Sequence, residues 1–167
     1  MQKVNRIQDK WRNAVFGCVG LLVIIADQLS KTWIRTNLDI GQRLFDTGFL
    51  QIVHVYNTGA AFGIFKDHSF TLTIVAFVGI IVILLLVFVL HSRWYFIDGM
   101  LVTSAVGLVL GGTIGNLIDR LRLGHVTDFI DFKVWPAFNV ADAAVTIGVL
   151  IIAYRIICLA QPAKHQE

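Results

Sequence analysis

Long uninterrupted apolar segments dominate the pattern of this chain. Residues 70–90 and 99–118 contain no charged side chain, and each reaches the roughly 20 apolar residues that a helix needs to cross a bilayer. Residues 14–34 and 138–160 also reach that length, although they include charged side chains. The pattern predicts an all-α polytopic membrane protein with four transmembrane helices, in a single integral membrane domain over residues 1–167.

Composition and charge agree with this class. Apolar residues make up 56% of the chain and charged residues 15%, whereas soluble domains carry about 25% charged residues. The net charge of +3 comes without a basic run interleaved with aromatic residues, so we expect no nucleic-acid binding. Cys18 and Cys158 lie inside apolar segments and form no Cys-x-x-Cys pair, which argues against a zinc or redox centre.

The segment between the first two spans is too long to be only a connection. Within residues 35–69, residues 49–56 are rich in strand-forming side chains and lie between two turn signals. We expect a small β-sheet on the outer membrane surface. In the third span, Gly107, Gly111 and Gly115 follow one another at four-residue spacing, which predicts close packing against another helix.

Basic residues indicate the orientation of the chain. The Lys and Arg counts on the two sides of the membrane nearly cancel, but Lys3, Arg6, Lys10 and Arg12 are concentrated before the first span. Cytoplasmic segments next to spans are enriched in such residues. We therefore expect both termini in the cytoplasm, with residues 35–69 and 119–137 facing outward.

Polar residues gather at one face of the membrane under this topology. Reversing the topology would move the whole set to the other face without scattering it. Polar groups within a membrane are costly and commonly functional. The set consists of Asp27, Lys31, Asn57, Asn116, Asp119, Arg120, Asp128, Asp131, Asn139 and Asp142.

Asp142 is the most informative member because it lies within an apolar helix. It has no Lys, Arg or His one turn away, so it must be protonated, paired in space or facing a polar cavity. Asn139 lies on the same helix face. Asp27 and Lys31 are four residues apart in the favourable acid-then-base order. Their pattern leaves open a structural ion pair or a contact to substrate or lipid headgroup.

Two carboxylates offer the best candidate chemistry. The chain has neither the Gly-x-Ser-x-Gly context of serine hydrolases nor a His-Glu-x-x-His zinc motif. Two carboxylates that share a proton can instead divide the acid and base roles in activating water. Asp128 and Asp142 bracket the entry to the fourth span and are the candidate pair.

A transporter or proton channel is the alternative, with Asp27 and Asp142 as relay groups. A relay also needs polar groups at mid-membrane depth. Residues 77–90 contain none, and only Thr103 and Ser104 interrupt the middle of the third span. A structural subunit, the third possibility, would leave Asp142 without a reason.

Several segments closely resemble the bacterial lipoprotein signal peptidases (signal peptidase II). They are residues 115–120, 124–130 and 138–142, together with Asp27–Lys31 and residues 57–62, which are similar to that family's two N-terminal motifs. The resemblance implies an enzyme of the bacterial inner membrane with its active site near the outer face. It also implies a metal-independent aspartyl peptidase, with no cofactor, that removes signal peptides from prolipoproteins just before a diacylglyceryl-modified cysteine.

The resemblance also implies residue roles. Asp128 and Asp142 match the catalytic pair, and Asp27 and Lys31 match positions with a structural role. Asn57, Asn116, Arg120 and Asn139 match positions that support the pair or bind substrate. Thr127 departs from the valine expected before the catalytic aspartate. The implied partners are diacylglyceryl prolipoproteins and membrane lipid, and we expect a monomer.

Overall fold

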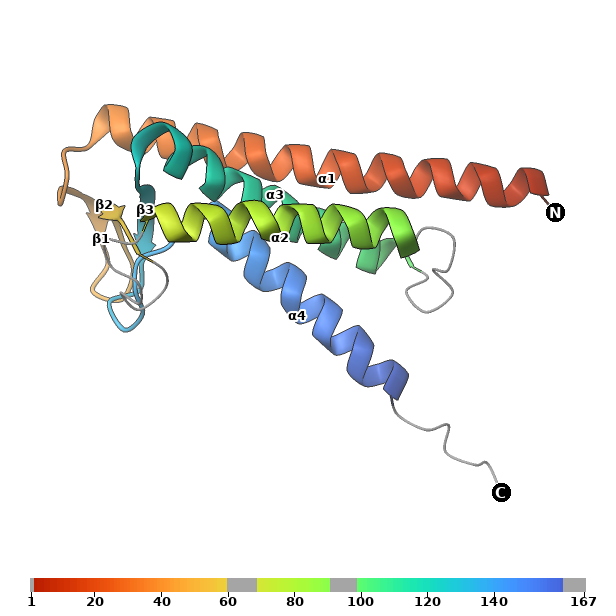
Figure 1. The fold of residues 1–167 in the computed structure, drawn as a ribbon. Coiled ribbons are helices and arrows are strands. Elements are labelled where there is room, and N and C mark those ends of the chain that lie inside the picture. The colour runs from red at the N-terminus through yellow and green to blue at the C-terminus, as the bar shows by residue number, and fades with distance from the viewer. Residues whose placement is uncertain (1, 60–68, 91–98, 161–167) are drawn as a thin grey trace, which may run out of the picture.

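A computed structural model describes residues 2–59, 69–90 and 99–160. Within these residues the chain forms four helices and three strands. The helices are α1 (Gln2–Asn37), α2 (Ser69–Leu90), α3 (Met100–Leu123) and α4 (Val140–Ala160). The strands lie together at one end of the helices, and α1 begins and α4 ends at the opposite end (Figure 1).

All four helices are long and apolar enough to span a membrane, which confirms the predicted number of spans. The qualifying segments are Lys10–Asn37, Ser69–Val87, Met100–Leu123 and Val140–Leu159. Large apolar side chains stay exposed along these helices, among them Leu22, Val75 and Leu150. Such a surface is stable against lipid tails, whereas water would disfavour it.

The end of α3 differs from the prediction. The apolar segment stops at residue 118, but α3 continues to Leu123, so residues 119–123 are helical and not part of a loop. The helix ends at Gly124, which adopts the left-handed conformation (φ 78°) and donates its backbone N–H to the carbonyl of Arg120. The extra turn keeps Asp119 and Arg120 on a rigid element.

The strands form one antiparallel sheet in the order β1-β2-β3. β1 covers Arg43–Asp46, β2 covers Gln51–Asn57 and β3 covers Val126–Asp131. β2 confirms the predicted strand, shifted by one or two residues. β3 lies within the outward-facing residues 119–137, where we predicted no strand, because its short segment gains its hydrogen-bond partners from the distant β2 and from Phe138.

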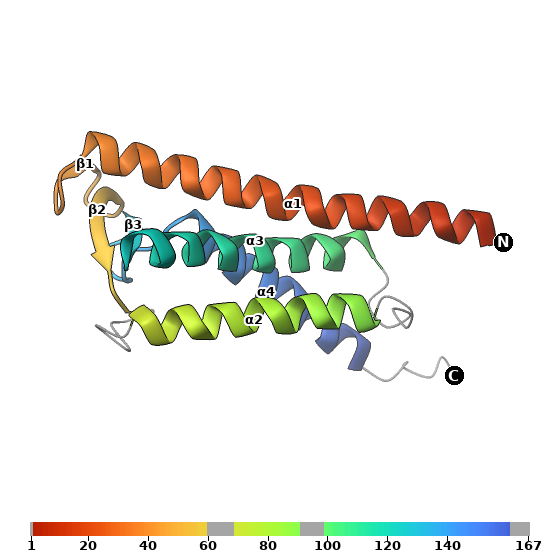
Figure 2. The ribbon, with the colours of Figure 1, turned by 45° about the horizontal axis from the view of Figure 1, so that its top comes forward.

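α3 lies between α1 and α2 (Figure 2), and its glycines allow α1 to approach closely. A Cβ atom on Gly107 would lie 2.9 Å from the carbonyl oxygen of Phe16, and one on Gly111 would lie 2.6 Å from that of Gly20. Side chains at these positions would separate the two helices. The predicted packing role of these glycines is therefore confirmed.

The sheet is fixed to the helices through a small apolar core. Phe129 of β3 packs with Ile34 and Leu38, at the end of α1 and just beyond it. This contact ties β3 to the first span, although they are far apart in the sequence.

Candidate active site

The predicted polar residues converge at the end of the helices that carries the sheet. α1 supplies Asp27 and Lys31, α3 supplies Asn116, and β3 and the start of α4 supply Asp128 and Asp142. Hydrogen bonds and ion pairs connect them into one network. The sequence pattern had placed these residues at one face of the membrane, and the structure brings them into contact.

Asp128 points away from the core side of β3 and is held by two asparagines. The Nδ2 atom of Asn57 donates to its Oδ2 at 2.8 Å, and the Nδ2 atom of Asn139 donates to its Oδ1 at 2.7 Å. Only 1% of Asp128 is exposed. Burial first, and then the nearby charge of Asp142, raise the pKa of Asp128 to about 7.

Asp142 is fixed at the start of α4 by a reciprocal cap. Its backbone N–H donates to Oδ1 of Asn139 at 3.0 Å, and its own Oδ2 accepts from the backbone N–H of Asn139 at 3.3 Å. This arrangement is a capping box, which satisfies free N–H groups at a helix start. Because Asn139 also donates to Asp128, one asparagine holds both carboxyl groups.

Asn116 gives Asp142 a second fixed donor. Its Nδ2 atom donates to Oδ1 of Asp142 at 2.8 Å. Its Oδ1 atom accepts from the ammonium of Lys31 at 2.8 Å and from Nδ2 of Asn139 at 3.1 Å. Lys31 and Asn139 are both donors and must therefore meet the carbonyl oxygen of the Asn116 amide. This orientation turns the NH₂ group of Asn116 toward Asp142.

Asp27 and Lys31 form a buried ion pair at 2.9 Å, with 0% exposure for both side chains. Asp27 also accepts the backbone N–H of Ala141 at 3.0 Å, at the start of α4. Lys31 pairs with Asp119 at 3.2 Å. Neither side chain reaches the surface, which favours the structural role over contact with substrate or headgroup.

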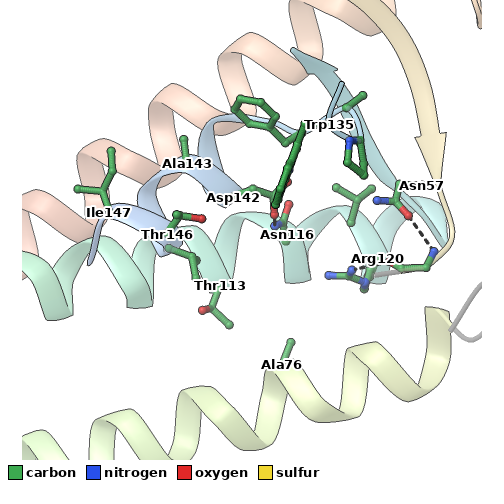
Figure 3. A pocket seen from close by; sticks show the side chains of 16 residues that line it. Asn57, Ala76, Thr113, Asn116, Arg120, Trp135, Asp142, Ala143, Thr146 and Ile147 are labelled. Atoms are coloured by element: carbon green, nitrogen blue, oxygen red, sulfur yellow. Dashed lines mark hydrogen bonds between the residues drawn. The ribbon is translucent and has the colours of Figure 1, made fainter. Parts of the chain in front are cut away.

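A cavity of about 620 Å³ opens beside this network, between α2, α3 and α4. Asp142 and Asn116 reach it, with Arg120 and Asn57 nearer the sheet and Ala76 on the facing helix (Figure 3). Asp128 does not line the cavity, whereas its neighbours Asn57 and Asp142 do. The full lining consists of Asn57, Gly59, Ala76, Thr113, Asn116, Arg120, Val126, Trp135, Pro136, Ala137, Phe138, Asp142, Ala143, Val145, Thr146 and Ile147.

Arg120 brings positive charge to the cavity. Its Nη2 donates to the carbonyl of Gly59 at 3.3 Å, and Gly59 donates its N–H to Oδ1 of Asn57 at 2.9 Å. Its Nε is buried and has no hydrogen-bond partner among the residues that the structure describes. The guanidinium therefore brings a positive charge to the cavity lining, where it favours a carbonyl or carboxylate oxygen.

Sequence reasoning missed several residues of the site. Gln28 donates to Asp27, Asp119 and the carbonyl of Gly115. Trp135 lines the cavity beside Asp142 (Figure 3). Gln28 could have been found because it is a polar residue within an apolar span, directly after Asp27. Trp135 could not, because it lies in a loop whose direction no sequence pattern reveals.

Asp131 lies apart from the network, at the far end of β3. It accepts from the side chain of Gln51 and from the backbone N–H of Lys133 at 2.7 Å. Among the described residues, no group of three or more His, Cys, Asp or Glu side chains could hold a metal ion.

Comparison with known proteins gives a consistent result. Residues 19–158 match the family model described as signal peptidase (SPase) II. The lipoprotein signal peptidase of Dehalococcoides mccartyi (strain 195) is 46% identical over 83% of this chain and 86% of that protein. That of Moorella thermoacetica is 40% identical over 90% of this chain and 96% of that protein.

Solved structures agree with the sequence relatives. A bacterial membrane enzyme determined by the in meso method at 2.3 Å resolution superposes with a TM-score of 0.75 and 30% identity, covering 90% of this chain and 92% of that one. A second such structure, at 1.9 Å resolution, gives a TM-score of 0.68, with 31% identity over 87% of this chain and 92% of that one. The polar network described above therefore lies in a membrane peptidase, because this chain belongs to the signal peptidase II family of lipoprotein signal peptidases.

Proposed function

We propose that Asp128 and Asp142 are the catalytic pair of an intramembrane aspartyl peptidase. The enzyme removes the signal peptide of a diacylglyceryl prolipoprotein by cutting just before the lipidated cysteine. The observation that supports this most directly is the pair held by Asn139, with one carboxyl facing the cavity and the other buried behind it. The charge of Asp142 acts on Asp128, and two like charges that are close to one another favour a single shared proton.

The two environments assign different roles to the carboxyl groups. Because burial and the charge of Asp142 raise the pKa of Asp128 to about 7, Asp128 carries the shared proton at pH values up to about neutral. Asp142 faces the cavity and acts as the base toward water. The water oxygen attacks the scissile carbonyl carbon while Asp142 takes a water proton and Asp128 protonates the carbonyl oxygen. When the C–N bond breaks, Asp142 gives its proton to the leaving amine and the product carbonyl re-forms by returning a proton to Asp128.

Neighbouring donors support these steps. Asn116 and Asn139 keep both carboxyls oriented, and positioning of this kind lowers the barrier before any bond changes. Arg120 holds the carbonyl of Gly59 and places its positive charge at the cavity, where it favours a substrate carbonyl oxygen. In the substrate complex the scissile carbonyl reaches Asp128 past Asn57, and catalytic contacts of this kind often form fully only when the substrate is bound.

The shape of the cavity matches the two parts of this substrate. Its deeper section, with Ala76, Thr113 and Ile147, lies between helices and fits an apolar signal peptide. Its section near the sheet, with Trp135, lies where the lipidated cysteine would leave the membrane. Aromatic side chains such as Trp135 are favoured at the membrane–water boundary.

We further propose that the chain is a single integral domain in the bacterial inner membrane, acting as a monomer surrounded by lipid. Both termini face the cytoplasm and the active site lies near the outer face. The basic residues before the first span support this orientation. The start of α1 and the end of α4 lie at the same end of the molecule (Figure 1), as an even number of spans requires.

The test uses the purified chain alone, in detergent with EDTA, and a purified diacylglyceryl prolipoprotein. We expect cleavage that leaves the lipidated cysteine as the new N-terminus, identified by mass spectrometry. The same prolipoprotein without lipid is the matched comparison and should react more slowly. Cleavage at another bond, or activity only after a divalent ion is restored, would contradict the proposal.

A further inference from the structure

Arg35 and Thr127 form a contact behind the catalytic strand. Thr127 directly precedes Asp128 and is 0% exposed. The Nη1 atom of Arg35 donates to the hydroxyl oxygen of Thr127 at 3.1 Å. Arg35 stands at the end of α1 and keeps 20% of its side chain exposed. Neither residue lines the cavity.

The contact lies on the face of β3 opposite Asp128. Side chains of successive strand residues point to opposite faces. Phe129 packs against Ile34 and Leu38, so Thr127 shares the face that meets α1, and Asp128 points the other way. Arg35 therefore reaches the strand from behind the proposed catalytic group.

Asp119 completes the contact. Its Oδ2 accepts the backbone N–H of Thr127 at 3.1 Å, and its Oδ1 lies 3.4 Å from Nη1 of Arg35. The carbonyl of Thr127 accepts from Nδ2 of Asn139 at 3.4 Å. The hydroxyl, N–H and carbonyl of Thr127 are thus all held by other side chains.

The pairing explains why a threonine is tolerated where the family resemblance leads us to expect valine. A buried hydroxyl without a partner is destabilising, and Arg35 supplies the partner. A valine would need no such donor. Threonine at this position and arginine at position 35 therefore form a matched set in this chain.

We propose that Arg35 and Thr127 are positioning residues that fix the backbone of β3 at Asp128 and so set the placement of Asp128 against Asp142. This inference rests on the proposed catalytic role of Asp128. Small displacements of a catalytic group slow chemistry strongly. Because the pair does not touch the cavity, its loss acts on kcat and leaves KM unchanged.

The experiment is a double-mutant cycle with the purified full chain and a diacylglyceryl prolipoprotein. Arg35→Met leaves the buried hydroxyl of Thr127 without its hydrogen-bond donor, and we expect kcat to fall about tenfold. Thr127→Val removes the hydroxyl while Arg35 keeps Asp119 and Thr32, and we expect a loss of about threefold. The double variant contains no unpaired buried hydroxyl, so its kcat should recover to that of Thr127→Val alone.

Independent effects would instead multiply to about thirtyfold in the double variant, and that result would overturn the inference. An unchanged kcat in Arg35→Met, or a change confined to KM, would also overturn it. Arg43→Met is the matched control: Arg43 is another cation at the same end, 62% exposed and 3.8 Å from Asp46, and kcat should not change.

Two further variants keep the result interpretable. If Arg35→Met does not accumulate in a folded form, the same cycle is run with Arg35→Lys, whose flexible ammonium does not reproduce the planar guanidinium that places Nη1 toward Asp119 and Thr127 and Nη2 toward Thr32. Thr127→Val should again relieve part of its loss, and the absence of that relief would overturn the inference. Asp128→Asn in the same assay separates the two proposals: an active Asp128→Asn removes the catalytic assignment, whereas an inactive one with an additive cycle removes only the positioning pair.

Discussion

Asn139 and Asp142 hold each other at the start of α4. The side chain of Asn139 accepts the backbone N–H of Asp142 at 3.0 Å, and the carboxylate of Asp142 accepts the backbone N–H of Asn139 at 3.3 Å. The same asparagine donates to Asp128 at 2.7 Å. A helix cap is therefore also the link between the two proposed catalytic groups.

The two functions of Asn139 can be separated by substitution. Asn139→Ser keeps a good helix cap but removes the buried donor to Asp128, so we expect strongly reduced cleavage with a smaller loss of stability than in Asn139→Ala. Asn139→Ala removes both and should lose about 1 kcal/mol more of unfolding free energy than Asn139→Ser. Cleavage rates and melting curves of the two variants provide the measurement. Full activity in Asn139→Ser would show that its amide is dispensable for the pair.

The rate should fall as the pH rises through about 7. The pKa of Asp128 is raised to about 7, so the carboxyl holds its proton below that pH and loses it above. Loss of the shared proton removes the acid and leaves two like charges. We expect kcat/KM to decline above neutrality, with an apparent pKa that belongs to the pair. A rate that stays constant to high pH would contradict the shared proton, and Asp131→Asn, as a control, should leave the profile unchanged.

Gly115→Ala should disrupt the network from its buried side. A Cβ atom at this position would lie 2.6 Å from Oδ2 of Asp27, so the Asp27–Lys31 pair must shift. We expect a loss of about 1–3 kcal/mol in unfolding free energy, as for overpacking elsewhere, together with reduced cleavage. Gly79→Ala is the control, because a Cβ atom there meets nothing within 4 Å. Equal melting temperatures for the two variants would contradict the tight packing at Gly115.

Both termini should be cytoplasmic while the sheet faces outward. Reporter fusions at Phe45, in β1, and at Lys164 should report opposite compartments. The expectation follows from four spans and the basic N-terminal segment. Two reporters in the same compartment would contradict this orientation.

The sequence was most informative where the physical constraint is local. Spanning length predicted all four helices, and four-residue glycine spacing predicted that another helix packs closely on the third span, which in the structure is α1 at Gly107 and Gly111. Polar residues in apolar helices pointed to the site because such residues need partners in a membrane.

Long-range partners could not be predicted in the same way. β3 pairs with the distant β2 and with Phe138, so no local sequence pattern predicted that Asp128 lies on a strand. Asn139 and Asp142 have the three-residue spacing of a capping box, which is visible in the sequence. Only the structure shows that Asn139 also donates to Asp128. The Arg35–Thr127 contact joins residues 92 positions apart and leaves no periodic signal.

The most direct test of the account is cleavage of a diacylglyceryl prolipoprotein by Asp128→Asn and Asp142→Asn, each quantified as folded protein in the membrane. Asparagine keeps the size of the side chain but cannot exchange the proton. We predict that each variant is inactive, that the double variant is no worse than either single variant, and that Asp131→Asn remains active. Near-normal cleavage by either Asp128→Asn or Asp142→Asn would contradict the two-carboxylate mechanism.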